Sequence, residues 1–129
     1  MAGVTKLKPP RLRLVGSCAG LSVYIVDGER VRHDHDIDFT MGGNEAIYPT
    51  YVPRGEIWID DALHPLDATA TTFHEIVERD LMLRLGWSYD DAHDAASECE
   101  IIFRKDLIAK RPSSLDLGRV ETAFRSCEH

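Results

Sequence analysis

The chain has 129 residues, of which 43% are hydrophobic and 29% charged, and its formal net charge is −7. These values are typical of a globular protein and predict a single domain over residues 1–129, of which residues 1–10 form a flexible arm. The negative charge disfavours nucleic acid as a partner, and the lack of an apolar span or signal peptide predicts a cytoplasmic protein that does not bind membranes.

The first half of the chain has the patterns of β structure. Asp27-Gly28 separates two alternating runs and predicts a hairpin turn, because both residues tolerate positive φ. The polar segment 34–54 is too long for a simple connection, so we expect a functional or covering loop. Strands are predicted at residues 11–15, 21–26, 30–33 and 56–60.

The second half has the periodicity of helices. A helix is predicted from about Asp67 to Leu85, ending at Gly86, and Ser88 with Asp91 caps a second helix that ends before Pro112. Ser114 is expected to cap a short third helix. The order of elements predicts an α+β fold, in which a small antiparallel sheet is packed by two long antiparallel helices and a short C-terminal helix.

The segment Thr72–Glu78 contains the sequence His-Glu-Ile-Val-Glu. On a helix, positions i and i+4 point about 40° apart, so His74 and Glu78 project side by side. Both side chains are competent zinc ligands. Glu75 lies at the edge of the same site, where it could hold or deprotonate a metal-bound water as the general base.

This short motif also has a structural interpretation without a metal. His74, Glu75 and Glu78 would then form a solvated helix face, with the two glutamates paired to Arg79 or Arg84.

The next predicted helix carries His93 and Glu100, seven residues apart and therefore nearly in line along it. A short connection at Gly86 should bring the two helices together as antiparallel neighbours. His93 would then complete a three-ligand site with an open fourth position. Glu100 is either a further ligand or a carboxylate that orients His93. The alternative for His93 is a partly buried helix histidine.

With a strand, a His-Glu-x-x helix and a third ligand on the following helix, residues 56–100 resemble the core of zincin metallopeptidases, in particular small gluzincin-type forms. The resemblance implies a zinc site, Glu75 as the base, and a substrate peptide added to an edge strand at residues 56–60. The chain also resembles small phage and mobile-element proteins of unassigned activity.

The chain departs from the zincin motif at Glu78, which stands where the motif has its second histidine. A carboxylate ligand makes the metal a weaker Lewis acid, and mixed ligation also suits iron or manganese. Three functions therefore stay open. They are a peptidase or amide hydrolase acting on a peptide or protein, a non-catalytic metal-stabilised module that binds a protein partner, and a metal-free buried network.

A second group of histidines and carboxylates is His33-Asp34-His35-Asp36, followed by Asp38. In a strand, His33 and His35 would face the same side and could bind a metal. The alternative is a solvated edge. The loop that follows could also cover the helix site, lined by Asp36, Asp38 or the Gly42-Gly43 turn.

The three cysteines, Cys18, Cys99 and Cys127, are too few and too scattered for a disulfide framework, and none lies in a Cys-x-x-Cys pair. We expect idle thiols in a reducing compartment. Glycine-rich nucleotide-binding motifs and the paired Glu-x-x-His motifs of di-iron bundles are absent from the sequence.

Overall fold

The computed structural model describes residues 10–127, so the arm predicted at the N-terminus lies almost entirely outside the described residues. No helix in this part of the chain is long and apolar enough to cross a membrane. In chain order the elements are β1 (Arg11–Cys18), β2 (Leu21–Val26), α1 (Gly28–Asp34), β3 (Gly42–Asn44), β4 (Glu56–Asp60), α2 (Pro65–Leu85), α3 (Tyr89–Lys110) and α4 (Leu117–Ser126).

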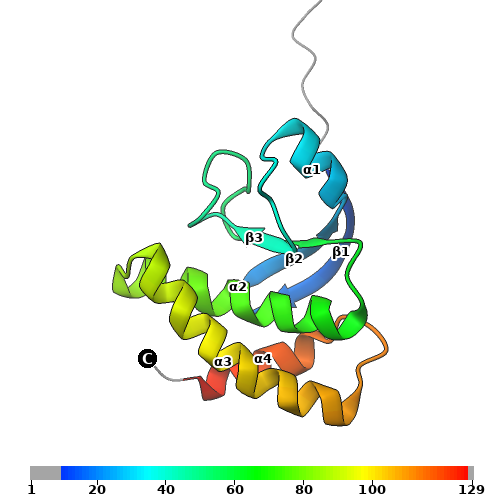
Figure 1. The fold of residues 1–129 in the computed structure, drawn as a ribbon, viewed down its shortest axis with the longest axis vertical. Coiled ribbons are helices and arrows are strands. Elements are labelled where there is room, and N and C mark those ends of the chain that lie inside the picture. The colour runs from blue at the N-terminus through cyan, green and yellow to red at the C-terminus, as the bar shows by residue number, and fades with distance from the viewer. Residues whose placement is uncertain (1–9, 128–129) are drawn as a thin grey trace, which may run out of the picture.

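The four strands form one sheet in the order β1-β2-β4-β3 (Figure 1). The α+β class is confirmed, but the sheet is mixed rather than antiparallel, because β2 and β4 run parallel while β1–β2 and β3–β4 run antiparallel. The predicted substrate-binding edge at β4 is wrong, since β4 is paired on both sides. The edge on that side of the sheet is the short strand β3.

The predicted hairpin at Asp27-Gly28 is wrong, and α1 takes the place of its second strand. Asp27 is the N-cap of α1, and its side chain accepts a hydrogen bond from the Arg30 backbone N–H (3.1 Å). Gly28 has an ordinary negative φ, and a Cβ there would collide with the Asp60 carboxylate. This glycine therefore serves a close approach, and α1 begins the crossover that the parallel pair β2–β4 needs.

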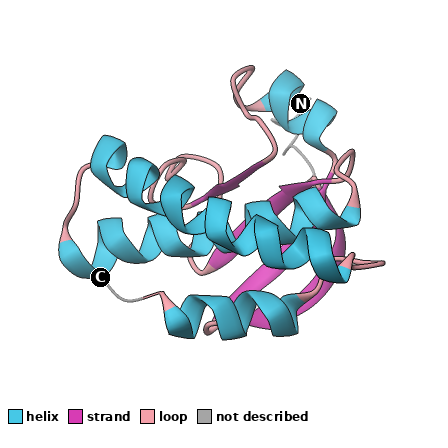
Figure 2. Ribbon diagram, turned by 60° about the horizontal axis from the view of Figure 1, so that its bottom comes forward, coloured by secondary structure: helices cyan, strands magenta, loops and turns pink. Residues whose placement is uncertain are grey.

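The sheet has a hydrophobic core on each face, because side chains alternate along its strands. Val23, Ile57 and Ile59 face α2, α3 and α4, which lie together on one side of the sheet (Figures 1 and 2). Val26 and Trp58 face the other way and pack with residues of α1 and of the loops around β3.

The helix ends follow the capping signals in most cases. Gly86 adopts the left-handed conformation and ends α2, and the Ser88 side chain caps α3 by accepting from the Asp91 backbone N–H. The predicted cap at Ser114 is wrong, because Asp116 is the N-cap of α4 and accepts from the Arg119 backbone N–H.

The segment 34–54 contains a strand that the sequence did not predict. Two of the three residues of β3 are glycines with no room for a side chain. A Cβ on Gly42 would meet the Thr71 side chain and the Trp58 carbonyl, and a Cβ on Gly43 would meet the Tyr48 ring. Gly42 lets β3 lie close to α2, Gly43 makes room for the Tyr48 ring, and Asn44 next to them reaches Glu75 on α2.

Candidate metal centre

The central part of α2 is buried on every side. Each residue from 68 to 78 is buried, including His74, Glu75 and Glu78. This burial excludes the interpretation of a solvated helix face. The arginines proposed to neutralise that face have other partners, because Arg79 pairs with Glu45 and Arg84 pairs with Asp80.

Three potential ligand atoms converge between α2 and α3. His74 Nε2 lies 3.0 Å from Glu78 Oε2 and 3.2 Å from His93 Nδ1, and the last two atoms are 2.8 Å apart. Within residues 10–127 this is the one group of three or more histidine, cysteine or carboxylate side chains arranged to hold a metal ion. The antiparallel packing predicted from the short connection therefore does bring His93 to His74 and Glu78.

The separations suit a single small ion. Ligand atoms on bonds of about 2.1 Å lie about 3.0 Å apart on an octahedral face and about 3.4 Å apart around a tetrahedral ion. The three observed distances match the octahedral value, and each would have to lengthen by a few tenths of an ångström to match the tetrahedral value. A bound cation would also give the buried Glu78 carboxylate a partner. Its Oε1 has no hydrogen-bond partner among the described residues, while Oε2 faces two imidazoles.

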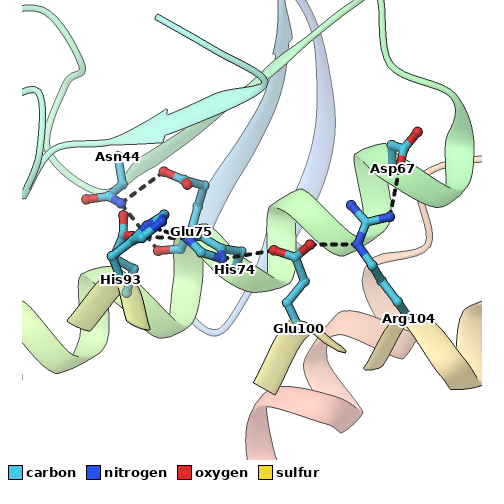
Figure 3. A network of polar contacts seen from close by, with 8 residues as sticks. Asn44, Asp67, His74, Glu75, His93, Glu100 and Arg104 are labelled. Atoms are coloured by element: carbon cyan, nitrogen blue, oxygen red, sulfur yellow. Dashed lines mark hydrogen bonds and ion pairs between the residues drawn. The ribbon is translucent and has the colours of Figure 1, made fainter. Parts of the chain in front are cut away.

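Glu100 contacts His74 rather than His93, so its predicted role in orienting His93 is wrong. Glu100 Oε1 lies 2.9 Å from His74 Nδ1, an ion-pair distance without the angles of a hydrogen bond, and Glu100 Oε2 accepts a 2.6 Å hydrogen bond from Arg104 Nε. Arg104 in turn donates to Asp67 Oδ1 at 2.8 Å, and Figure 3 shows this chain from His74 to Asp67. Such a carboxylate on the far nitrogen fixes the ring of a metal-binding histidine.

The same contacts set the charge of His74 when no metal is bound. Burial by itself lowers the pKa of His74, but the contacts with Glu100 and Glu78 outweigh burial and raise it to about 10. Metal binding must therefore displace a proton from this ring at neutral pH.

Glu75 is held in the same site by the edge strand. Its Oε1 accepts a 3.1 Å hydrogen bond from Asn44 Nδ2, visible at the left of Figure 3. Burial raises the pKa of the Glu75 carboxyl, and the charge of Glu78 raises it further. A carboxyl with a raised pKa and a fixed orientation has the properties of a general base or acid that works near neutral pH.

A cleft of about 390 Å³ opens beside these side chains. It is lined by the ligand group, by Glu75, by Tyr48 and by β3, and Tyr89 stacks on the His93 ring with centroids 5.3 Å apart. Asp38 and Gly42 line the cleft, as predicted for the covering loop. Asp36 instead accepts a hydrogen bond from the Tyr51 hydroxyl.

The second histidine-rich segment is spread over α1 and the turn after it. The His33 side chain is 86% exposed and contacts Asp34, while His35 stacks on Tyr51. None of these residues belongs to a group able to hold a metal within the described part of the chain. The prediction that His33 and His35 face one side assumed a strand, and the helix α1 invalidates that assumption.

Comparisons of the chain with protein-family models, with curated protein sequences and with solved structures found no match.

Sequence reasoning missed two residues that support this site. Asn44 lies in the Gly-Gly-Asn segment, which has the composition of a turn, so nothing indicated that it would form the edge strand over α2. Arg104 could have been found, because it follows Glu100 by four residues and such pairs meet on a helix.

Proposed function

We propose that the protein binds one divalent metal ion through His74, Glu78 and His93, and that the ion is zinc. The convergence of three ligand atoms within about 3 Å, in a buried pocket with one open side, carries this proposal. Iron or manganese is the main competitor, because two imidazoles and a carboxylate also suit those ions.

We further propose that the site hydrolyses a peptide or amide bond. A bound zinc ion would polarise the carbonyl and lower the pKa of a coordinated water. Glu75 would take the proton from that water, and the hydrogen bond from Asn44 to Oε1 would hold the carboxylate in one orientation. The resemblance of residues 56–100 to zincins supports this role, although Glu78 in place of histidine weakens the Lewis acid.

An extended peptide is the substrate that suits the walls of this cleft. β3 is the edge strand of the sheet, it pairs with β4 on one side, and its first residue, Gly42, lines the cleft. All three residues of β3 are buried, and the Gly42 N–H and the Asn44 carbonyl oxygen already have partners in the adjoining loops, so a peptide would add to this edge only after those loops had moved. We therefore transfer to β3 the substrate-binding role that the sequence assigned to β4.

The second candidate is a non-catalytic module in which the metal joins α2 to α3. The ligand set favours it in one respect, since an added carboxylate ligand supports binding better than it supports catalysis. In this case the partner would be another protein, and the chain would act as a binding module of a phage or mobile element. Metal would then matter for stability and partner binding alone.

Elemental analysis of the full chain, purified without a metal-affinity tag, tests the shared part of both candidates. We expect about one equivalent of metal per chain if the three ligands act together. A metal-free protein whose melting temperature does not respond to zinc or to a chelator would contradict both.

Glu75→Gln separates the two candidates. If Glu75 is the base, the variant keeps its zinc but loses cleavage of a fluorogenic peptide mixture by roughly 100-fold or more. Glu98→Gln, at an exposed position on α3, is the matched control and should cleave like the parent. Hydrolysis is ruled out if the zinc-loaded parent cuts no peptide, or if Glu75→Gln cuts as fast as the control.

A further inference from the structure

The two cysteines farthest along the chain lie side by side, although 28 residues separate them. Cys99 is on α3 and Cys127 is at the C-terminal end of α4, and their sulfur atoms are 2.7 Å apart. Both are half-buried thiols. The sequence suggested idle cysteines, because nothing in the spacing indicated that α4 would return to α3.

The pair is positioned for a disulfide. A disulfide needs its sulfurs at about 2.05 Å, so closure requires a movement of about 0.7 Å, which small side-chain rotations can supply. Cys99 and Cys127 also line an open apolar groove of about 810 Å³ between α3 and α4. A small oxidant can therefore reach them from solvent.

We propose that Cys99 and Cys127 form an intramolecular disulfide that fastens α4 to α3. The oxidant is a low-molecular-weight disulfide such as oxidised glutathione. One protein thiolate attacks that disulfide and releases one thiol, giving a mixed disulfide. The second protein thiolate then attacks the protein sulfur of the mixed disulfide and releases the second thiol. The two cysteines lose two protons and two electrons, and the oxidant is reduced to two thiols.

The cross-link would join two helices of the folded domain. It closes a loop that contains the second half of α3, the connection and all of α4, which should stabilise the protein by restricting the unfolded chain. It also fixes the turn of α3 that carries Glu100, the neighbour of Cys99 and the partner of His74. The reaction should be slow at neutral pH, because burial and the Cys99 thiol raise the pKa of Cys127 to about 12.

Cys18 provides an internal control. Its thiol is buried and contacts Glu121 Oε2 and the Leu117 carbonyl oxygen, at 3.3 and 3.8 Å respectively. We expect it to stay reduced.

The test is to treat the full chain with oxidised glutathione, block the remaining thiols and map the peptides by mass. The expected product has lost about 2 Da, links Cys99 to Cys127 and carries the blocking group on Cys18. Its melting temperature should be roughly 5–15 °C higher, and a reductant should reverse this rise.

Variants separate this cross-link from other effects of oxidation. Cys18→Ser should show the same rise in melting temperature, whereas Cys99→Ser and Cys127→Ser should show none. The proposal is overturned by stable glutathione adducts on Cys99 or Cys127, by a disulfide that includes Cys18, by disulfide-linked dimers, or by an unchanged melting temperature in the cross-linked parent. The metal plays no part in this test.

Discussion

Two groups of histidine and carboxylate side chains in this protein differ in whether they come together: one is dispersed and the other converges on one point. His33, Asp34 and His35 lie on and after α1, while His74, Glu78 and His93 lie between α2 and α3. The first group spreads into solvent or against separate neighbours, with the His33 side chain 86% exposed. The second places three ligand atoms within 3.2 Å of one another.

The difference arises from the packing around each helix and not from composition. α1 has seven residues and one buried face, and only His33 of the two histidines lies on it, because His35 is its C-cap and stacks on Tyr51 instead. α2 is covered by the sheet on one side and by α3 on the other, and each of its two neighbours adds a polar side chain to the site, Asn44 from β3 and His93 from α3. A metal site is therefore expected where two elements contribute to one buried point.

The largest expected effect is the loss of metal affinity in His93→Ala. Removal of one of three protein ligands should weaken zinc binding by on the order of a thousandfold. Because the His93 side chain is 44% exposed, the variant should still fold. The measurement is a zinc titration of apo-protein against a competing chelator. His33→Ala is the matched control, and the comparison breaks down if it weakens zinc binding as much as His93→Ala does.

Removal of the metal from the parent should lower its free energy of unfolding by about as much as a thousandfold change in zinc affinity is worth. A ligand present at 1,000 times its Kd stabilises the folded state by about 4 kcal/mol, so a chelator should lower the melting temperature by roughly 15 °C. His33→Ala should respond in the same way as the parent and His93→Ala much less. Equal melting curves for the parent with and without chelator would mean that no metal joins α2 to α3 and that hydrogen bonds alone link these side chains.

A smaller effect is expected from the residues behind His74. Glu100→Gln should weaken zinc binding by roughly 10-fold to 100-fold, because it removes the charge that orients and polarises the ring. Arg104→Met should have a smaller effect in the same direction, since Arg104 acts through Glu100. Competition titrations with the chelator measure both. Unchanged affinity in Glu100→Gln would mean that His74 is positioned by packing instead.

The smallest effect concerns the α1 segment. Asp27→Ala removes the side-chain acceptor at the start of α1 and should lower the free energy of unfolding by about 1 kcal/mol, with no change in zinc affinity. Urea denaturation of the apo-protein gives the first quantity and the chelator titration the second. A loss of zinc affinity in this variant would show that the two segments are coupled.

The site was more predictable than the sheet. The i,i+4 spacing of His74 and Glu78, the stop at Gly86 and the cap at Ser88 are local signals, and together they place His93 opposite α2. The parallel pairing of β2 with β4 is a long-range choice, and no single residue specifies it. The hairpin predicted at Asp27-Gly28 was wrong because aspartate caps helices as readily as it forms turns. The glycine is required there by its close contact with Asp60.

Asn44 shows a further limit. Its amide contacts Glu75 where β3 approaches α2, and that approach requires the missing side chain of Gly42 and depends on the tertiary fold. The pairing of Cys99 with Cys127 depends in the same way on the path of α4.

The most direct test of the metal site is the anomalous X-ray scattering of zinc-loaded crystals of the full chain, recorded above and below the zinc absorption edge. We predict one peak about 2.0–2.2 Å from His74 Nε2, Glu78 Oε2 and His93 Nδ1, and none beside His33 or His35. A zinc-loaded crystal with no peak at these three atoms, or with its peak on the α1 segment, would contradict the account.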